Sequence, residues 1–112
     1  MVIEISEKPK STLERLRETV KELGEKYPNI KVLFDDIVLH AEWAKEDARL
    51  CHYKSLFQEL RGIGYTMSSA VRLGWMDEDD IMKLETAISE LEYEIKREIT
   101  EKCGCKKAEL WL

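Results

Sequence analysis

The spacing of apolar residues in the C-terminal third of the chain constrains its fold more than any other feature. Apolar side chains recur there three and four positions apart, at Ile81, Leu84, Ile88, Leu91 and Ile95. This alternation places them on one stripe of an α-helix. Asp77 precedes the stripe as a potential N-cap, and three acidic residues follow where the helix dipole favours negative charge. We therefore predict a helix that starts after Asp77 and ends at Cys103-Gly104-Cys105.

The same periodicity occurs near the N-terminus, at Leu13, Leu16, Val20, Leu23 and Tyr27. The preceding segment Ser11-Thr12-Leu13-Glu14 has the pattern of a capping box, in which a serine and a glutamate satisfy backbone N–H groups reciprocally. Pro28 disfavours the helical conformation of the residue before it. These features predict a helix that starts at Ser11 and ends before Pro28.

The segment from Asn29 to Leu60 is apolar on two sides, and it predicts one long central helix that ends near Gly62 and Gly64. Residues 65–75 predict a short helix with Gly74 as its cap. The chain is accordingly predicted to be an all-α antiparallel bundle of three long helices and one short helix, forming a single domain over residues 1–112. The apolar residues at 2–5 and 108–112 are compatible with short terminal β-strands.

Composition narrows the classes of function. The net charge is -5, and a chain of this sign is repelled by phosphate backbones, so nucleic acid is not an expected partner. No apolar run approaches the ~20 residues of a membrane span, and no signal peptide precedes the first helix, so we expect a cytoplasmic protein. Many Glu and Lys residues, with one Asn and one Gln, are typical of a thermophilic source.

Residues 65–75 are similar to the first helix and turn of DNA-binding helix-turn-helix domains, because a glycine stands in the presumed turn. The similarity covers about a tenth of the chain. The following helix would read DNA, yet it opens with Asp77-Glu78-Asp79-Asp80, which phosphates repel. A DNA-binding regulator is therefore the least favoured hypothesis, and no catalytic or phosphate-binding motif favours an enzyme.

Cys103-Gly104-Cys105 is the segment most suited to chemistry, because two close cysteines can bind a soft metal ion or form a disulfide with each other. Asp36 and His40 share one helix face. If their helix runs antiparallel to the last helix, these four side chains, Asp36, His40, Cys103 and Cys105, could bind one zinc ion. Cys51 lies about 16 Å beyond His40 along a continuous helix, so it is interpreted as a small buried residue.

The second apolar face of the central helix supports the leading hypothesis, a helical interaction or adaptor module. A small bundle does not need both faces for its own core, so one face is available to a partner. The partner would be a second copy of the chain in a homodimer, or another protein. The side chains predicted to make the contact are Leu39, Trp43, Leu50, Tyr53 and Phe57. A metal-binding or redox protein is the alternative.

Overall fold

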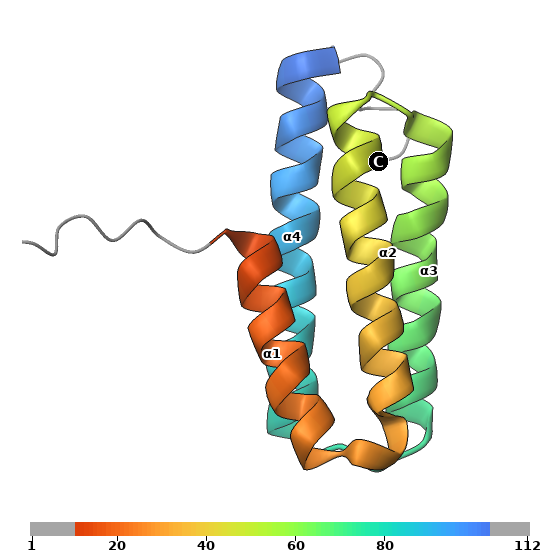
Figure 1. The fold of residues 1–112 in the computed structure, drawn as a ribbon, viewed down its shortest axis with the longest axis vertical. Coiled ribbons are helices and arrows are strands. Elements are labelled where there is room, and N and C mark those ends of the chain that lie inside the picture. Colours follow the sequence, from red (N-terminus) through yellow and green to blue (C-terminus); the bar gives the residue numbers. More distant parts are fainter. Residues whose placement is uncertain (1–10, 104–112) are drawn as a thin grey trace, which may run out of the picture.

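The computed structural model describes residues 11–103 (Figure 1), and the regular secondary structure in this part of the chain is entirely helical. No strand occurs within residues 11–103, and the predicted terminal strands lie outside this range. The all-α prediction is confirmed. The helices are α1 (Thr12–Lys26), the 3-10 turn η2 (Pro28–Ile30), α2 (Lys31–Arg49), α3 (Tyr53–Arg72) and α4 (Glu78–Cys103).

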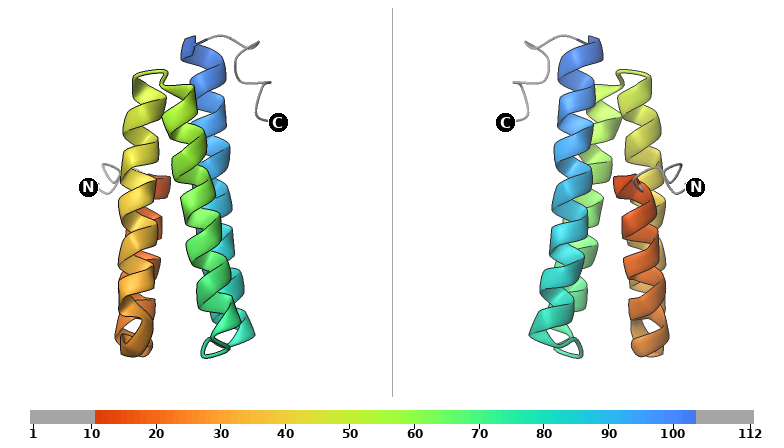
Figure 2. Two further views of the ribbon diagram at one scale, coloured as in Figure 1. Left: turned by 90° about the vertical axis from the view of Figure 1, so that its right-hand side faces the viewer. Right: turned by 90° about the vertical axis from the view of Figure 1, so that its left-hand side faces the viewer.

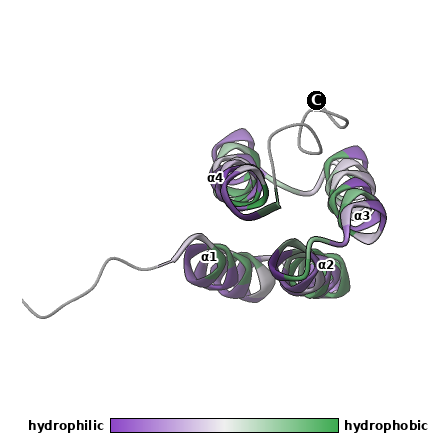
Figure 3. Ribbon diagram, turned by 90° about the horizontal axis from the view of Figure 1, so that it is seen from above, coloured by the Kyte–Doolittle hydropathy of each residue, from purple (hydrophilic) through white to green (hydrophobic). Residues whose placement is uncertain are grey.

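Viewed end-on, the four α-helices stand at the corners of an irregular four-sided figure, with α3 and α4 farther apart than α1 and α2 (Figure 3). One layer contains α1 and α2, and the other contains α3 and α4 (Figure 2). Consecutive helices run antiparallel, so α2 and α4, which lie across a diagonal, run parallel. The most extensive helix pairing is between α2 and α3. This arrangement is a four-helix bundle with short connections.

The core is one cluster of apolar side chains from all four helices. The stripe predicted for α4 faces this core, with Ile81 partly buried and the other four residues buried. On α2 three fully buried alanines, Ala41, Ala44 and Ala48, leave room for close packing. The largest fully buried side chains are Leu16, Leu23, Phe34, Ile37, Leu56, Ile63, Leu84, Leu91, Ile95 and Ile99.

Several predicted helix ends are confirmed. Ser11 and Glu14 form both hydrogen bonds of the capping box, at 3.0 and 3.1 Å. After α1, Pro28 occupies the first position of η2, where its missing N–H costs nothing. Gly74 follows α3 with φ +69°, a conformation that a glycine adopts without steric penalty.

The predicted long helix from Asn29 to Leu60 is wrong, because the chain reverses direction at residues 50–52. The N–H of His52 donates to Asp47 O (2.9 Å), and the N–H of Cys51 donates to Ala48 O (3.2 Å). This pair of bonds is a Schellman motif, and it requires a left-handed residue at position 51. Cys51 adopts that conformation, with φ +58°.

The reversal also changes the remainder of the predicted secondary structure. Gly62 and Gly64 lie inside α3 and do not end a helix, and residues 65–72 are the second half of α3. Helices α3 and α4 run antiparallel (Figures 1 and 2), and α4 packs more extensively against α1 and α2 than against α3, whereas the helices of a helix-turn-helix cross steeply. The helix-turn-helix similarity does not extend to this geometry. None of the described helices combines the length and apolarity that crossing a membrane requires.

A polar cluster joins the end of α1 to the start of α4. Asp80 Oδ2 accepts hydrogen bonds from Lys26 Nζ (2.7 Å) and Tyr27 Oη (2.6 Å). Tyr27 Oη in turn accepts the backbone N–H of Asp77 at 3.0 Å. The Lys26 ammonium and the Tyr27 hydroxyl hold the pKa of Asp80 below its ordinary value, and the same contact raises the pKa of Lys26.

Candidate interaction surface

Large apolar side chains are exposed mainly on one half of the bundle. Of the eleven in the described part of the chain, nine belong to α2, α3 and the turns that follow them, and the other two, Met82 and Tyr93, belong to α4. Single exposed apolar residues are ordinary, but a concentration on two neighbouring helices is not. The nine are Val32, Leu39, Trp43, Leu50, Phe57, Tyr65, Val71, Leu73 and Trp75.

Four of these side chains form a stripe along α2, which we call the α2 stripe: Val32, Leu39, Trp43 and Leu50. Their spacings of seven, four and seven residues keep them on one side of the helix. The opposite side of α2 carries the buried alanines and Ile37. Trp43, near the centre of the stripe, is 49% exposed, and Leu39 is 41% exposed. The stripe is therefore a solvent-facing apolar seam at a corner of the bundle.

The other two residues of the predicted contact lie on α3. Phe57 is exposed there, with the Arg61 guanidinium 5.7 Å from the centre of its ring. Tyr53 is partly buried, and its hydroxyl donates to the backbone carbonyl of Cys103 at 3.3 Å. Because the chain reverses at Cys51, the five predicted residues do not share one helix face. Leu39, Trp43 and Leu50 stay together, and Tyr53 contacts the end of α4.

His40 connects the α2 stripe to α3. Its Nδ1 lies 2.5 Å from Glu59 Oε1, and its Nε2 lies 3.4 Å from Asp36 Oδ2. The His40 ring also meets the Trp43 ring edge-on, with 5.9 Å between centroids. Thr66 donates to the same Asp36 oxygen at 2.7 Å. These contacts hold His40, and His40 limits the orientations open to Trp43.

Glu59 was not among the residues singled out from the sequence. On one continuous helix it would lie far from His40, nineteen residues away. Only the reversal at residues 50–52 brings the two together. The sequence signals of this cluster are the i, i+4 spacing of Asp36 and His40 and the i, i+3 spacing of His40 and Trp43.

Charged side chains flank the stripe near its C-terminal end. Arg49 donates to Glu46 from Nε at 3.1 Å, and this guanidinium lowers the pKa of Glu46. Burial raises the pKa of Asp47, and the Glu59 carboxylate adds to the effect. The stripe thus has a charged and salt-bridged border, as interfaces with an apolar centre commonly do.

The structure brings together only part of the predicted zinc site. Asp36 and His40 are close, as their shared helix face predicted, but His40 is occupied by Glu59 as well. The site required α2 and α4 to be antiparallel, and they are parallel (Figure 1). Cys103 therefore lies beside Cys51, beyond the C-terminal end of α2, and not near the start of α2 as the site required. Cys105 lies outside the described residues. Within residues 11–103, no three His, Cys, Asp or Glu side chains form a metal-binding group.

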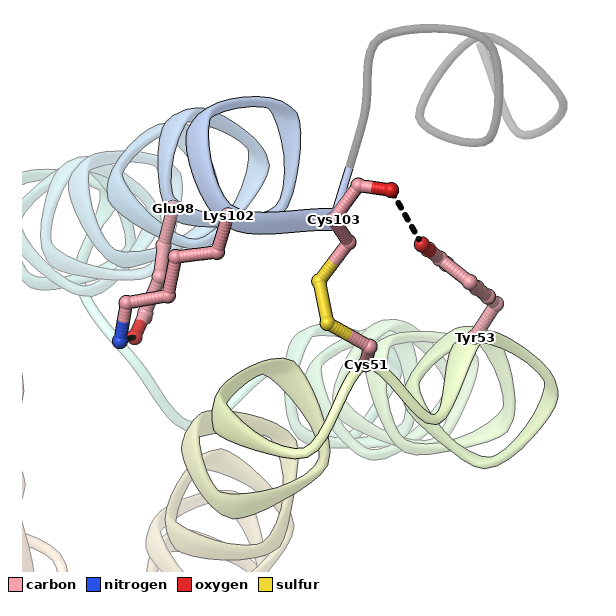
Figure 4. The surroundings of a disulfide bond; sticks show 5 residues. All are labelled: Cys51, Tyr53, Glu98, Lys102 and Cys103. Carbon is pink, nitrogen blue, oxygen red and sulfur yellow. Dashed lines mark hydrogen bonds and ion pairs between the residues drawn. A yellow bond between two sulfur atoms is a disulfide. The ribbon is translucent and has the colours of Figure 1, made fainter.

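Cys103 forms a disulfide with Cys51 (Figure 4), with 6.0 Å between their Cα atoms. The interpretation of Cys51 as a small buried residue set apart from the other candidate site residues is therefore wrong. It assumed a continuous helix, and the reversal instead places Cys51 beside the end of α4. The bond joins the α2–α3 turn to the last residue of α4, next to the Tyr53 hydrogen bond. A sulfur in a disulfide has no thiolate to offer a metal ion.

Comparison with known proteins found no match among protein-family models, curated proteins or solved structures.

Proposed function

We propose that this protein is an interaction module that binds a protein partner through the α2 stripe. The observation that carries the proposal is the half-exposed Trp43 ring near the centre of an apolar stripe. Tryptophan is enriched at interface positions that contribute most to binding, especially where an apolar centre has a polar border. Support also comes from the concentration of exposed apolar side chains on α2 and α3.

The free energy available from burying the exposed half of Trp43 is large enough to support specific binding. A tryptophan side chain has roughly 200–250 Å² of surface, and about half of that of Trp43 is exposed. Burying this half against a partner would contribute about 2–3 kcal/mol. The contact of the indole ring with His40 limits its rotation in the unbound protein, which lowers the entropy cost of binding.

Selection of peptides from a phage-displayed library tests the proposal, with the affinity of each selected peptide then measured by fluorescence polarisation. We expect helical peptides with an apolar seam to bind the wild type and to lose at least tenfold in affinity for a Trp43→Lys variant. Tyr93→Lys is the matched control, since Tyr93 is an exposed aromatic residue on α4. Selected peptides that bind all three proteins equally would contradict the proposal.

A second candidate function is thiol–disulfide exchange, and the Cys51–Cys103 disulfide favours it. Cys105 follows Cys103 by two residues in the sequence. Its thiolate would attack the Cys103 sulfur, form a Cys103–Cys105 bond and release the Cys51 thiolate, so no external oxidant is needed. Alkylation of the native protein tests this: exchange labels both Cys51 and Cys105, and Cys105→Ser abolishes labelling at Cys51. Labelling of Cys105 alone in the wild type would contradict it.

A further inference from the structure

The α2 stripe is symmetric along its own sequence. Leu39 and Trp43 lie two residues on either side of Ala41, and Val32 and Leu50 lie nine residues on either side. Ala41 itself is fully buried on the core side of α2. A stripe with this symmetry is complementary to a second copy of itself when the two helices run antiparallel. A two-fold axis across α2 near Ala41 then exchanges the members of each pair.

We propose that the partner is a second copy of this chain, bound through an antiparallel pairing of the two α2 helices. The proposal rests on the interaction function proposed above and names its partner. Leu39 of each copy packs against Trp43 of the other, and Val32 packs against Leu50. Spacings of four and seven residues are those of the seam of paired helices, in which apolar side chains interdigitate.

An antiparallel pairing suits these side chains better than a parallel one. Parallel helices would set each Trp43 against its equivalent, leaving two large rings at one level and two smaller side chains at the next. The antiparallel pair instead combines a large with a smaller residue at both central levels, which fills space evenly. Opposed helix dipoles also favour this direction.

One pair of charges beside the stripe also favours the antiparallel direction. Asp35 and Arg49 border the same side of the stripe, six and eight residues from Ala41, so two-fold symmetry brings the carboxylate of one copy near the guanidinium of the other. A parallel pairing would set each charge beside its equivalent. The same symmetry sets Asp35 level with Glu46 and Glu42 level with its equivalent, but each of these carboxylates has a cationic partner in its own chain: Lys31, Arg49 and Arg17, respectively. On the other side of the stripe it sets Asp36 level with Asp47, and Asp36 is bound within its own chain by Thr66 and His40.

The contact covers one helix at a corner of the bundle, so it is small and the dimer is weak. Interfaces of this class fall below the standard size and are transient. We expect a dissociation constant in the micromolar range, and a monomer at nanomolar concentration.

Sedimentation equilibrium of two complementary variants tests the pairing. Leu39→Lys and Trp43→Glu each place a charge in the apolar contact, and we expect each alone to weaken dimerisation at least 100-fold. An equimolar mixture restores the dimer, because in the mixed pair the introduced lysine of one variant meets the introduced glutamate of the other. The second contact of that pair remains Trp43 against Leu39. Circular dichroism checks that both variants keep the helical fold, and Tyr93→Lys on α4 should dimerise normally.

Each other outcome has a definite meaning. A mixture that stays monomeric would overturn the antiparallel pairing, and so would a dimer that survives Trp43→Glu. A wild type that is monomeric at 500 µM, roughly a hundred times the expected constant, would overturn the second copy as the partner. If Trp43-dependent peptide binding persists in that case, the interaction function stands and its partner is another protein; if it is also absent, both proposals fail.

Discussion

At the scale of single residues, two glycines of α3 have opposite surroundings although they are two positions apart. A Cβ atom built on Gly62 would lie 3.0 Å from His40 Cε1 and 3.1 Å from both ring nitrogens, whereas nothing lies within 4 Å of one built on Gly64. Both positions are inside a helix, where glycine is less favourable than alanine. The missing side chain at residue 62 therefore lets α3 approach His40, and the glycine at residue 64 has no such role.

We predict opposite effects for the two alanine substitutions. Gly64→Ala should raise the free energy of unfolding by about 0.5–1 kcal/mol, the usual gain in helix propensity. Gly62→Ala has the same gain but must displace His40 from Glu59 and Trp43, so its net effect should be destabilising. Urea unfolding of the two variants measures the difference, and equal stabilisation by both would show that His40 can move without cost.

At the scale of helices, α1 is attached to α4 by the cluster around Asp80, and the pKa of this carboxyl is lower in the fold than in the unfolded chain. A lowered pKa means that the folded state binds the proton less readily. The resulting stabilisation is present above the unfolded value, near 3.9, and is lost as pH falls towards and through the lower folded value.

Asp80→Asn removes this titration and leaves Lys26 with a neutral partner at every pH. We predict that the variant is less stable than the wild type at pH 7 and that the difference shrinks as pH falls below about 4. Urea midpoints at pH 7, 4 and 2.5 measure it, with Asp79→Asn, an exposed neighbour, as the control. A difference independent of pH would mean that Asp80 acts through packing alone.

The sequence predicted α1 and α4 well, because local chemistry determines them. The capping box at Ser11, the proline at 28 and the alternation of apolar residues from Ile81 require no knowledge of the rest of the fold. The end of α2 was missed because its Schellman motif uses Cys51 where a glycine is usual. The apolar pattern continues through this turn on both sides, so the pattern alone favours one helix.

The candidate site also contains features that the sequence predicts and features that it does not. The stripe of Leu39, Trp43 and Leu50 follows from spacing within one helix, and the structure leaves all three exposed. The contacts of His40 with Glu59, and the disulfide of Cys51, link segments that meet only after the chain reverses. Without the turn at residues 50–52, no pattern in the sequence identifies these pairs.

At the scale of the whole molecule, the disulfide connects cysteines 52 residues apart in the sequence. Closing a loop of that length restricts the unfolded chain and, in the chain-entropy account, stabilises the fold by about 4 kcal/mol. This is a large share of the stability of a typical domain of this size.

We therefore predict that Cys103→Ser, or reduction with a phosphine, lowers the free energy of unfolding by about 2–4 kcal/mol. Urea unfolding with and without the reductant measures the change, and the reductant should have no further effect on Cys103→Ser. Cys105→Ser should retain the reductant effect of the wild type. Unchanged unfolding of the wild type after complete reduction would show that packing alone holds the end of α4 to the α2–α3 turn.

The same bond divides the chain mechanically. It closes a covalent ring from Cys51 to Cys103 that contains α3 and α4, whereas α1 and α2 lie before the ring. Tension applied to the two ends of the chain would pass from α2 through the sulfur–sulfur bond, past the whole ring. The oxidised chain would then extend roughly 180 Å less than the reduced chain, at about 3.5 Å per bypassed residue. Half of the bundle would carry no load until the disulfide is reduced.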